Sequence, residues 1–283
     1  MTATVTTATE TGTAATTAAE GRRAGLGALM LSEWTKIRSV RSTVWSLALL
    51  LVLFPAFAVL FVSVGVAQWD QASPENRAQI VADPASTILG SGFLISQLAV
   101  CVLGVLVIAS EYSTGMIRAS LMAVPRRLPV LAAKSLVFGL LVLAVSLVAA
   151  FTAFFLGAPM LSSKAPVSLG DPGVLRAVLG SGLYLAVLGL FALAIGAIVR
   201  HTAGGITGVI GFVLVLAPIV QLLPGQVGKY LHAYMPTEAG HLISQARRAP
   251  GDLLSPWQGF GVFCLWTAVL LTVAAVLLKR RDA

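Results

Sequence analysis

The sequence predicts an all-α polytopic membrane protein with six transmembrane helices, preceded by an amphipathic interfacial helix. Three observations predict this fold. Apolar residues make up 57% of the 283 residues and charged residues only 11%, whereas a soluble domain carries about 25% charged residues. Six stretches of bilayer-spanning length contain no Asp, Glu, Lys, Arg or His. Most Lys and Arg residues fall on one side of these stretches. Together these features disfavour a soluble enzyme and a nucleic-acid-binding domain.

The first 25 residues form a tail rich in Thr and Ala. It has no aromatic residue and no apolar periodicity, so it lacks the surface that would order it. It also lacks the basic start and the early apolar run of a signal peptide. We expect a disordered cytoplasmic tail.

Residues 26–43 have the pattern of an elbow helix, a helix that lies along the membrane surface before the first span. Its candidate functional residues are Glu33, Trp34, Lys36 and Arg38. The apolar residues fall on one face at helical spacing, and Glu33 lies inside their arc. A local pair with Lys36, three positions on, would explain this placement. A partner on a neighbouring helix or loop is the alternative.

The transmembrane domain covers residues 44–279. A bilayer core about 30 Å thick requires roughly 20 helical residues, and lipid offers no partner for an unpaired backbone group. The sequence therefore predicts spans at 44–66, 88–109, 135–156, 177–199, 203–223 and 259–278.

The distribution of basic residues predicts the orientation. Thirteen of the 19 Lys and Arg residues lie on the side that holds both ends of the chain. Short loops rich in Lys and Arg stay in the cytoplasm. Both termini, including the short tail 280–283, are therefore predicted to be cytoplasmic.

One cytoplasmic connection, residues 110–134, is both long and patterned. Thr114 or Ser113 can cap a short helix, whose apolar side chains share one face, and Pro125 ends it. Such a helix, held between two spans, would let a soluble partner push on both spans at once. The alternative is a solvated loop that only carries positive charge.

The chain resembles the permease subunits of ABC-2 type ATP-binding-cassette exporters, those of actinobacteria in particular. The resemblance rests on L-S-E-W-T-K-I-R-S-V-R-S-T at 31–43 and on E-Y-S-T-G-M-I-R-A-S-L at 111–121. P-R-R at 125–127, Lys134 and Y-M-P-T-E-A-G at 234–240 extend it. It covers residues 26–281.

The resemblance implies a half-transporter that pairs with a second permease copy or a sister permease and binds a separate ABC ATPase subunit. The ATPase would contact the loop between spans two and three, around Glu111, Gly115, Ile117, Arg118, Leu121, Pro125 and Arg127. ATP would bind to the partner subunit, because this chain has no Walker loop. We expect no catalytic, cofactor-binding or metal-binding residue in this chain, and no nucleic-acid partner.

Two polar residues of the second span, Ser96 and Gln97, are candidates for lining the transport path, although helix–helix hydrogen bonding is the commoner role of such residues. The uncharged spans disfavour a secondary transporter and favour an amphiphilic or hydrophobic substrate. The alternative function is a membrane anchor or immunity-type subunit that binds partner proteins without transporting anything.

Overall fold

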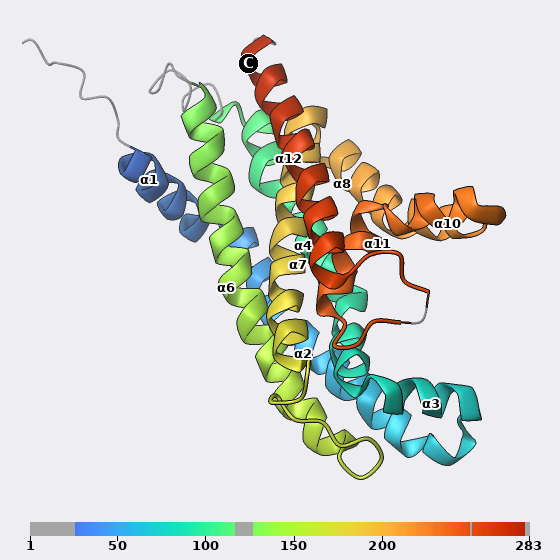
Figure 1. The fold of residues 1–283 in the computed structure, drawn as a ribbon. Coiled ribbons are helices and arrows are strands. Elements are labelled where there is room, and N and C mark those ends of the chain that lie inside the picture. Colours follow the sequence, from blue (N-terminus) through green and yellow to red (C-terminus); the bar gives the residue numbers. More distant parts are fainter. Residues whose placement is uncertain (1–25, 117–126, 250, 281–283) are drawn as a thin grey trace, which may run out of the picture.

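The protein is a bundle of long helices (Figure 1). The computed structural model describes residues 26–116, 127–249 and 251–280. The described residues form helices and contain no strand. The predicted all-α fold is confirmed, and six of the helices are long and apolar enough to cross a membrane.

The long helices follow one another along the chain and extend beyond the predicted spans at most of their ends. They are α2 (Arg41–Ala67), α4 (Pro84–Ser113), α6 (Arg127–Leu161), α7 (Val174–Val199) and α12 (Pro256–Arg280). The fifth span is composite and consists of α8 (Thr202–Ile210), the π-helical turn η2 (Gly211–Leu216) and α9 (Ala217–Gln221). Hydropathy marks only the part of a helix that lies at bilayer depth, so polar residues continue several helices past their spans.

Local capping explains where two of these helices begin. The Asp83 carboxylate accepts a hydrogen bond from the Ser86 amide at the start of α4. At the start of α12, the Ser255 hydroxyl accepts from the Gln258 amide and the Gln258 side chain accepts from the Ser255 amide. Both arrangements satisfy amides that have no partner inside the helix. Pro84 and Pro256 follow the caps, at a position where a missing N–H costs nothing.

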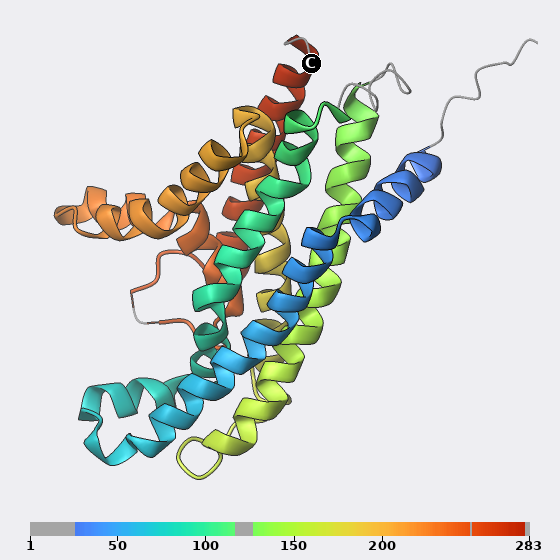
Figure 2. The same ribbon diagram turned by 180° about the vertical axis from the view of Figure 1, so that it is seen from behind.

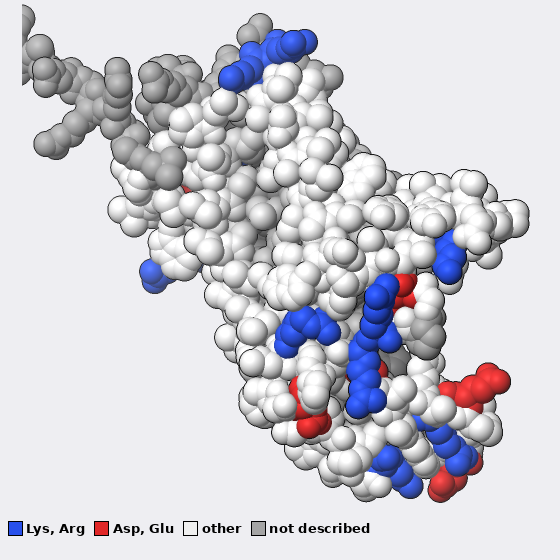
Figure 3. All heavy atoms as spheres, in the orientation of Figure 1, with Lys and Arg blue, Asp and Glu red and all other residues white. Residues whose placement is uncertain are grey.

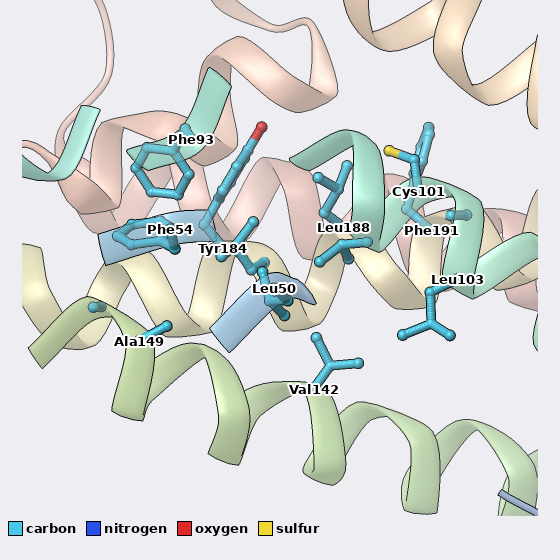
Figure 4. Packing of buried hydrophobic residues seen from close by; sticks show 14 of the residues in the cluster. Leu50, Phe54, Phe93, Cys101, Leu103, Val142, Ala149, Tyr184, Leu188 and Phe191 are labelled. Carbon is cyan, nitrogen blue, oxygen red and sulfur yellow. The ribbon is translucent and has the colours of Figure 1, made fainter. Parts of the chain in front are cut away.

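The centre of the bundle is α7. It is the most buried of the six spans, and it packs against α4, α6, α8 and α12. Figure 4 shows how Leu50 and Phe54 of α2 meet Tyr184 and Leu188 of α7 in this core. The ring centroids of Phe54 and Phe93 lie 5.2 Å apart, edge to face, the geometry that aromatic pairs prefer.

The elbow helix is α1 (Leu26–Ser39). Val40, which has an extended conformation, separates it from α2. Leu29 and Ile37 are buried, whereas Trp34 is 41% exposed. Figure 2 shows α1 beside α6, near the end of the bundle where α4 ends and α6 begins. We call this end of the bundle the elbow end.

The segment between α9 and α12 leaves the bundle and then returns into it. It contains two short helices, α10 (Gly225–Ala233) and α11 (Pro236–His241), followed by the short turn η3 (Leu242–Ser244). In Figure 1, α10 projects sideways from the bundle. Both α11 and η3 pack against α7 and α12, and Ala239 and Ile243 are completely buried.

Glycines make this return possible. A Cβ at Gly180 of α7 would overlap the carbonyl oxygen of Ile243, and one at Gly259 of α12 would overlap that of Ala239. Two backbones can approach this closely only where there is no side chain. The Leu-Gly-Ser-Gly pattern that contains Gly180 also occurs at residues 89–92, but a Cβ at Gly90 would meet nothing within 4 Å.

Hydrogen bonds fix the last residues of the returning segment in a part of the bundle that is distant from the elbow end. The Ser86 hydroxyl accepts a hydrogen bond of 2.8 Å from the Ala246 amide, and the Asp83 carboxylate accepts one of 2.8 Å from the Arg247 amide. Arg176 donates to the Ala246 carbonyl at 3.0 Å. The short helix α3 (Pro74–Ala82) lies near this end and connects α2 to α4. The face of the molecule drawn in Figure 3 is mostly uncharged, with both signs of charge toward its lower end.

The two glycines of the repeated pattern give a matched test. Gly180→Ala should destabilise the protein by about 1–3 kcal/mol, because the new methyl group overpacks the contact with Ile243. Gly90→Ala should be neutral or stabilise by up to about 1 kcal/mol, because Ala favours the helix and has room. Denaturant unfolding in micelles measures both. Equal losses in the two variants would contradict the proposed close packing.

Candidate functional site

The helices that flank the predicted cytoplasmic loop are longer than the sequence indicated. The loop was predicted over residues 110–134, but α4 continues to Ser113 and α6 begins at Arg127. Glu111 therefore lies in the last turn of α4 and Lys134 in the second turn of α6. This helical placement fixes both side chains at the elbow end, next to α1 (Figures 1 and 2).

Four charged side chains meet there and form what we call the charge cluster: Glu33, Lys36, Glu111 and Lys134. The Lys134 Nζ lies 2.6 Å from Glu33 Oε2 and 2.8 Å from Glu111 Oε1. The Lys36 Nζ lies 2.6 Å from Glu33 Oε1 and 3.5 Å from Glu111 Oε1. The cluster thus joins α1, α4 and α6 through one buried ammonium group.

Three members of the charge cluster are shielded from solvent. Lys134 and Glu33 are each 2% exposed and Glu111 is 5% exposed, whereas the Lys36 side chain is 28% exposed. Removing an ion from water costs roughly several kcal/mol unless a close ion of opposite charge compensates for the lost hydration. With two carboxylates and two ammonium groups, the formal charges of the cluster sum to zero.

The pKa values of Glu33 and Lys36, the two cluster members on α1, follow from the balance between burial and neighbouring charge. Burial by itself would raise the pKa of Glu33, but the ammonium groups of Lys134 and Lys36 outweigh it and hold the pKa below its ordinary value of 4.5. Burial would lower the pKa of Lys36, but Glu33 and Glu111 outweigh it and raise the pKa above 10.5. Both groups are therefore charged at neutral pH.

The structure contains both of the arrangements considered for Glu33. It pairs locally with Lys36 and also reaches Lys134, which is 101 positions away along the chain. The two remaining elbow candidates, Trp34 and Arg38, are exposed and lie outside the charge cluster.

The other residues proposed for ATPase contact are placed only in part. Gly115 is exposed and has a φ of +71°, a left-handed conformation that favours glycine. Ile117, Arg118, Leu121 and Pro125 lie outside the described residues, and Arg127 is the first residue of α6. Because Glu111 is buried in the charge cluster, its carboxylate is not an exposed contact site. Glu111 is connected to the segment that follows α4 through the α4 backbone.

The two path-lining candidates lie in the core rather than at the charge cluster. Ser96 is completely buried, and its hydroxyl has no hydrogen-bond partner among the described residues. Gln97 accepts a hydrogen bond of 3.4 Å from the Tyr184 hydroxyl, which connects α4 to α7. The Tyr184 ring also lies 5.7 Å from that of His241 on the returning segment. This is the helix-bridging role that such residues commonly have.

Sequence reasoning did not identify Lys134 as the centre of the cluster, although it noted the residue as part of a resemblance. The signal was Glu33, a carboxylate inside the apolar arc of a helix, which requires a buried cation nearby. Tyr184 and His241 were missed as well. Their positions in the sequence do not distinguish them from ordinary core and surface residues.

The fold and the charge cluster define a multi-pass membrane protein whose spans are uncharged and whose ionic contacts gather where the elbow helix meets two spans. A family model described as ABC-2 family transporter protein matches residues 28–283. The chain therefore belongs to the ABC-2 transporter family, and it is a permease subunit of an ABC transporter located in the cell membrane. No curated protein sequence matches the chain.

The buried lysine provides the first test of the charge cluster. Lys134→Met should lower the free energy of unfolding by about 3–5 kcal/mol, because it leaves two buried carboxylates with Lys36 as the remaining cation of the charge cluster. Lys279→Met, at the exposed end of α12, should change it by less than about 0.5 kcal/mol. Denaturant titration of both variants in the same micelles measures the difference. A loss no larger than that of the control would show that the cluster does not hold the elbow end together.

The pKa shifts predict how this stability depends on pH. Because the folded pKa of Glu33 lies below 4.5, its contribution is present above 4.5 and is lost as the pH falls through the folded value. Because the folded pKa of Lys36 lies above 10.5, its contribution is lost only as the pH rises beyond that value. The thermal midpoint of the wild type should therefore fall more steeply below pH 4.5 than that of Glu33→Gln. Parallel acid curves for the two proteins would rule out this assignment.

Proposed function

We propose that the chain is the membrane-spanning subunit of an ATP-driven exporter, and that a separate ATPase subunit drives it through the segment between α4 and α6. The observation that supports this proposal is the charge cluster. It joins both helices that flank the segment to the elbow helix, through pairs of 2.6 and 2.8 Å at Lys134.

The cluster suits mechanical coupling because buried ion pairs resist separation. A partner that pushes on residues 114–126 displaces the ends of α4 and α6 together. Since Lys134 holds carboxylates of both α1 and α4, moving one helix alone would leave a charge unpaired in a shielded place. The three helices would therefore move as a unit. This arrangement supports the lever over the solvated loop, and we propose that the elbow end lies in the cytoplasm.

We propose an amphiphilic or hydrophobic substrate and outward transport. The six predicted spans contain no Asp, Glu, Lys, Arg or His, whereas proton- and ion-coupled transporters normally keep such groups at membrane depth. Energy from ATP on the partner subunit takes the place of ion coupling. Direction is inferred from the resemblance to exporters.

We further propose that the permease works as a pair, with a second copy or a sister permease. The support comes from α9 and α10, which project from the bundle in Figure 1. Leu222 is 83% exposed and Val227 is 75% exposed. A Cβ at Gly208 of α8 would meet nothing within 4 Å. A neighbouring permease would provide the contacts that this part of a single chain lacks.

Co-purification tests the ATPase contact. The permease is expressed with the ATPase encoded beside it, and Arg118→Asp and Leu121→Asp are compared with Arg280→Asp at the end of α12. Each of the first two changes should reduce the retained ATPase at least about tenfold, because an unpaired charge at an interface costs roughly 2–5 kcal/mol. The control should retain it.

Two results would contradict the proposal. If both loop variants retained the ATPase, the contact would lie elsewhere. If the intact complex bound ATP but moved no amphiphile in inverted vesicles, the anchor function would be favoured over transport.

A further inference from the structure

A second set of contacts joins helices at the elbow end, apart from the charge cluster. It is centred on Arg200, in the turn between α7 and α8. The Arg200 guanidinium lies over the Tyr112 ring of α4, 5.0 Å from its centroid, within the range of a cation–π interaction. It also donates a hydrogen bond of 3.2 Å to the Leu277 carbonyl in the last turn of α12. One side chain thus connects the turn between α7 and α8 to the ends of α4 and α12.

The backbone at Arg200 has a conformation that arginine disfavours. Its φ is +57° and its ψ is +17°, and among the described residues it is the one non-glycine residue with a positive φ. In this left-handed region the Cβ of an L-residue lies too close to the following carbonyl oxygen, so helices that end this way usually carry glycine there. The guanidinium is therefore held between α4 and α12 despite backbone strain, and such strained residues cluster at switch regions.

Close packing also joins α4 to α7 and α8, two turns earlier in α4. A Cβ at Gly196 would lie 3.1 Å from Val105 Cα, and one at Gly205 would lie 2.7 Å from Val105 Cγ1. Helices this close resist being pushed together, because their atoms would overlap. They resist separation only weakly, since single dispersion contacts are weak and lipid can replace them. Arg200 supplies an attraction that holds the three helices together when α4 is pulled away.

The Arg200 contacts and the charge cluster meet at the end of α4. Tyr112 directly follows Glu111, and one small cavity is lined by both Tyr112 and Lys134, together with residues of α7 and α12. The charge cluster joins the end of α4 to α1 and α6, whereas Arg200 joins it to the α7–α8 turn and α12. A displacement of this end therefore reaches both sets of contacts.

We propose that Arg200 is a positioning residue, which transmits a displacement of the end of α4 to the start of the fifth span and the end of the sixth. The inference rests on the proposed function, because it takes the ATPase to act on the segment that follows α4. A displaced α4 carries Tyr112 with it. The guanidinium follows the ring and moves the start of α8, and the hydrogen bond to Leu277 moves α12. These two spans are the least buried of the six, so they can follow α4 without rearranging the core around α7.

Hydrogen exchange tests this transmission in the intact complex. The permease and the ATPase encoded beside it are assembled in nanodiscs, and exchange is followed by mass spectrometry with and without a non-hydrolysable ATP analogue. In the wild type, the analogue should change exchange both at the end of α4, residues 106–113, and at the start of α8, residues 201–210. Arg200→Gly should reduce the change in α8 at least about fivefold, the lower end of ordinary coupling factors. It should leave the change in α4 in place.

A pair of substitutions separates positioning from structural support. Arg200→Gly and Arg200→Ala both remove the guanidinium, but glycine adopts the left-handed conformation without strain. Arg200→Gly should therefore melt about 2–4 °C above Arg200→Ala, whereas both should lose the α8 response equally. A response that followed the melting temperature would assign Arg200 a purely structural role and overturn the proposal.

A second pair of substitutions tests the ring. Tyr112→Phe keeps an aromatic face for the guanidinium and should keep the α8 response, whereas Tyr112→Leu should lose it. Equal losses in the two variants would rule out the cation–π contact as the link. Arg280→Ala, at the exposed end of α12, removes an arginine from the same end of the bundle and should leave both responses unchanged.

The remaining outcomes separate this inference from the proposed function. If the α8 response persisted in Arg200→Gly, the inference would be overturned and the ATPase contact would stand, because the end of α4 would still respond. If the end of α4 did not respond in the wild-type complex, the proposed coupling itself would be contradicted, and the inference with it.

Discussion

The arrangement of the elbow end depends on one buried ammonium group. Lys134 is 2% exposed, and burying an ammonium group costs roughly several kcal/mol unless carboxylates lie close to it. Glu33 and Glu111 supply these carboxylates from two other helices. Three elements that are far apart in the sequence are thereby fixed at one point. The apolar spans impose no comparable requirement, because van der Waals packing in lipid tolerates small shifts of one helix against another.

Much of the fold follows from the sequence because the bilayer limits the possible structures. Backbone groups in hydrocarbon must bond within their own segment, so a long uncharged stretch can only be a helix. The composite fifth span was predicted with the others on this basis, although its centre is π-helical. The return of α11 into the bundle was not predictable. Gly90 and Gly180 occupy the same local pattern, yet only Gly180 meets another backbone closely.

The charge cluster shows the same limit for the candidate site. Helical periodicity relates Glu33 to Lys36, because both lie on one short helix. It says nothing about Lys134, which becomes a neighbour only through the packing of α1 on α6. The anomaly of a carboxylate in an apolar arc indicated that some buried partner exists. Which cation fills that role depends on long-range geometry, which a single sequence does not contain.

The two sides of the elbow helix differ in what holds them, and this difference bears on coupling. Toward α6, the buried Leu29 and Ile37 add apolar packing to the Glu33–Lys134 pair. Toward α4, a groove lined by residues of both helices separates α1 from α4, and the Lys36–Glu111 pair bridges it. Both sides therefore carry ion pairs whose separation would leave a shielded charge unpaired. A displacement of α4 would therefore carry α1 and α6 with it, as the proposed coupling requires.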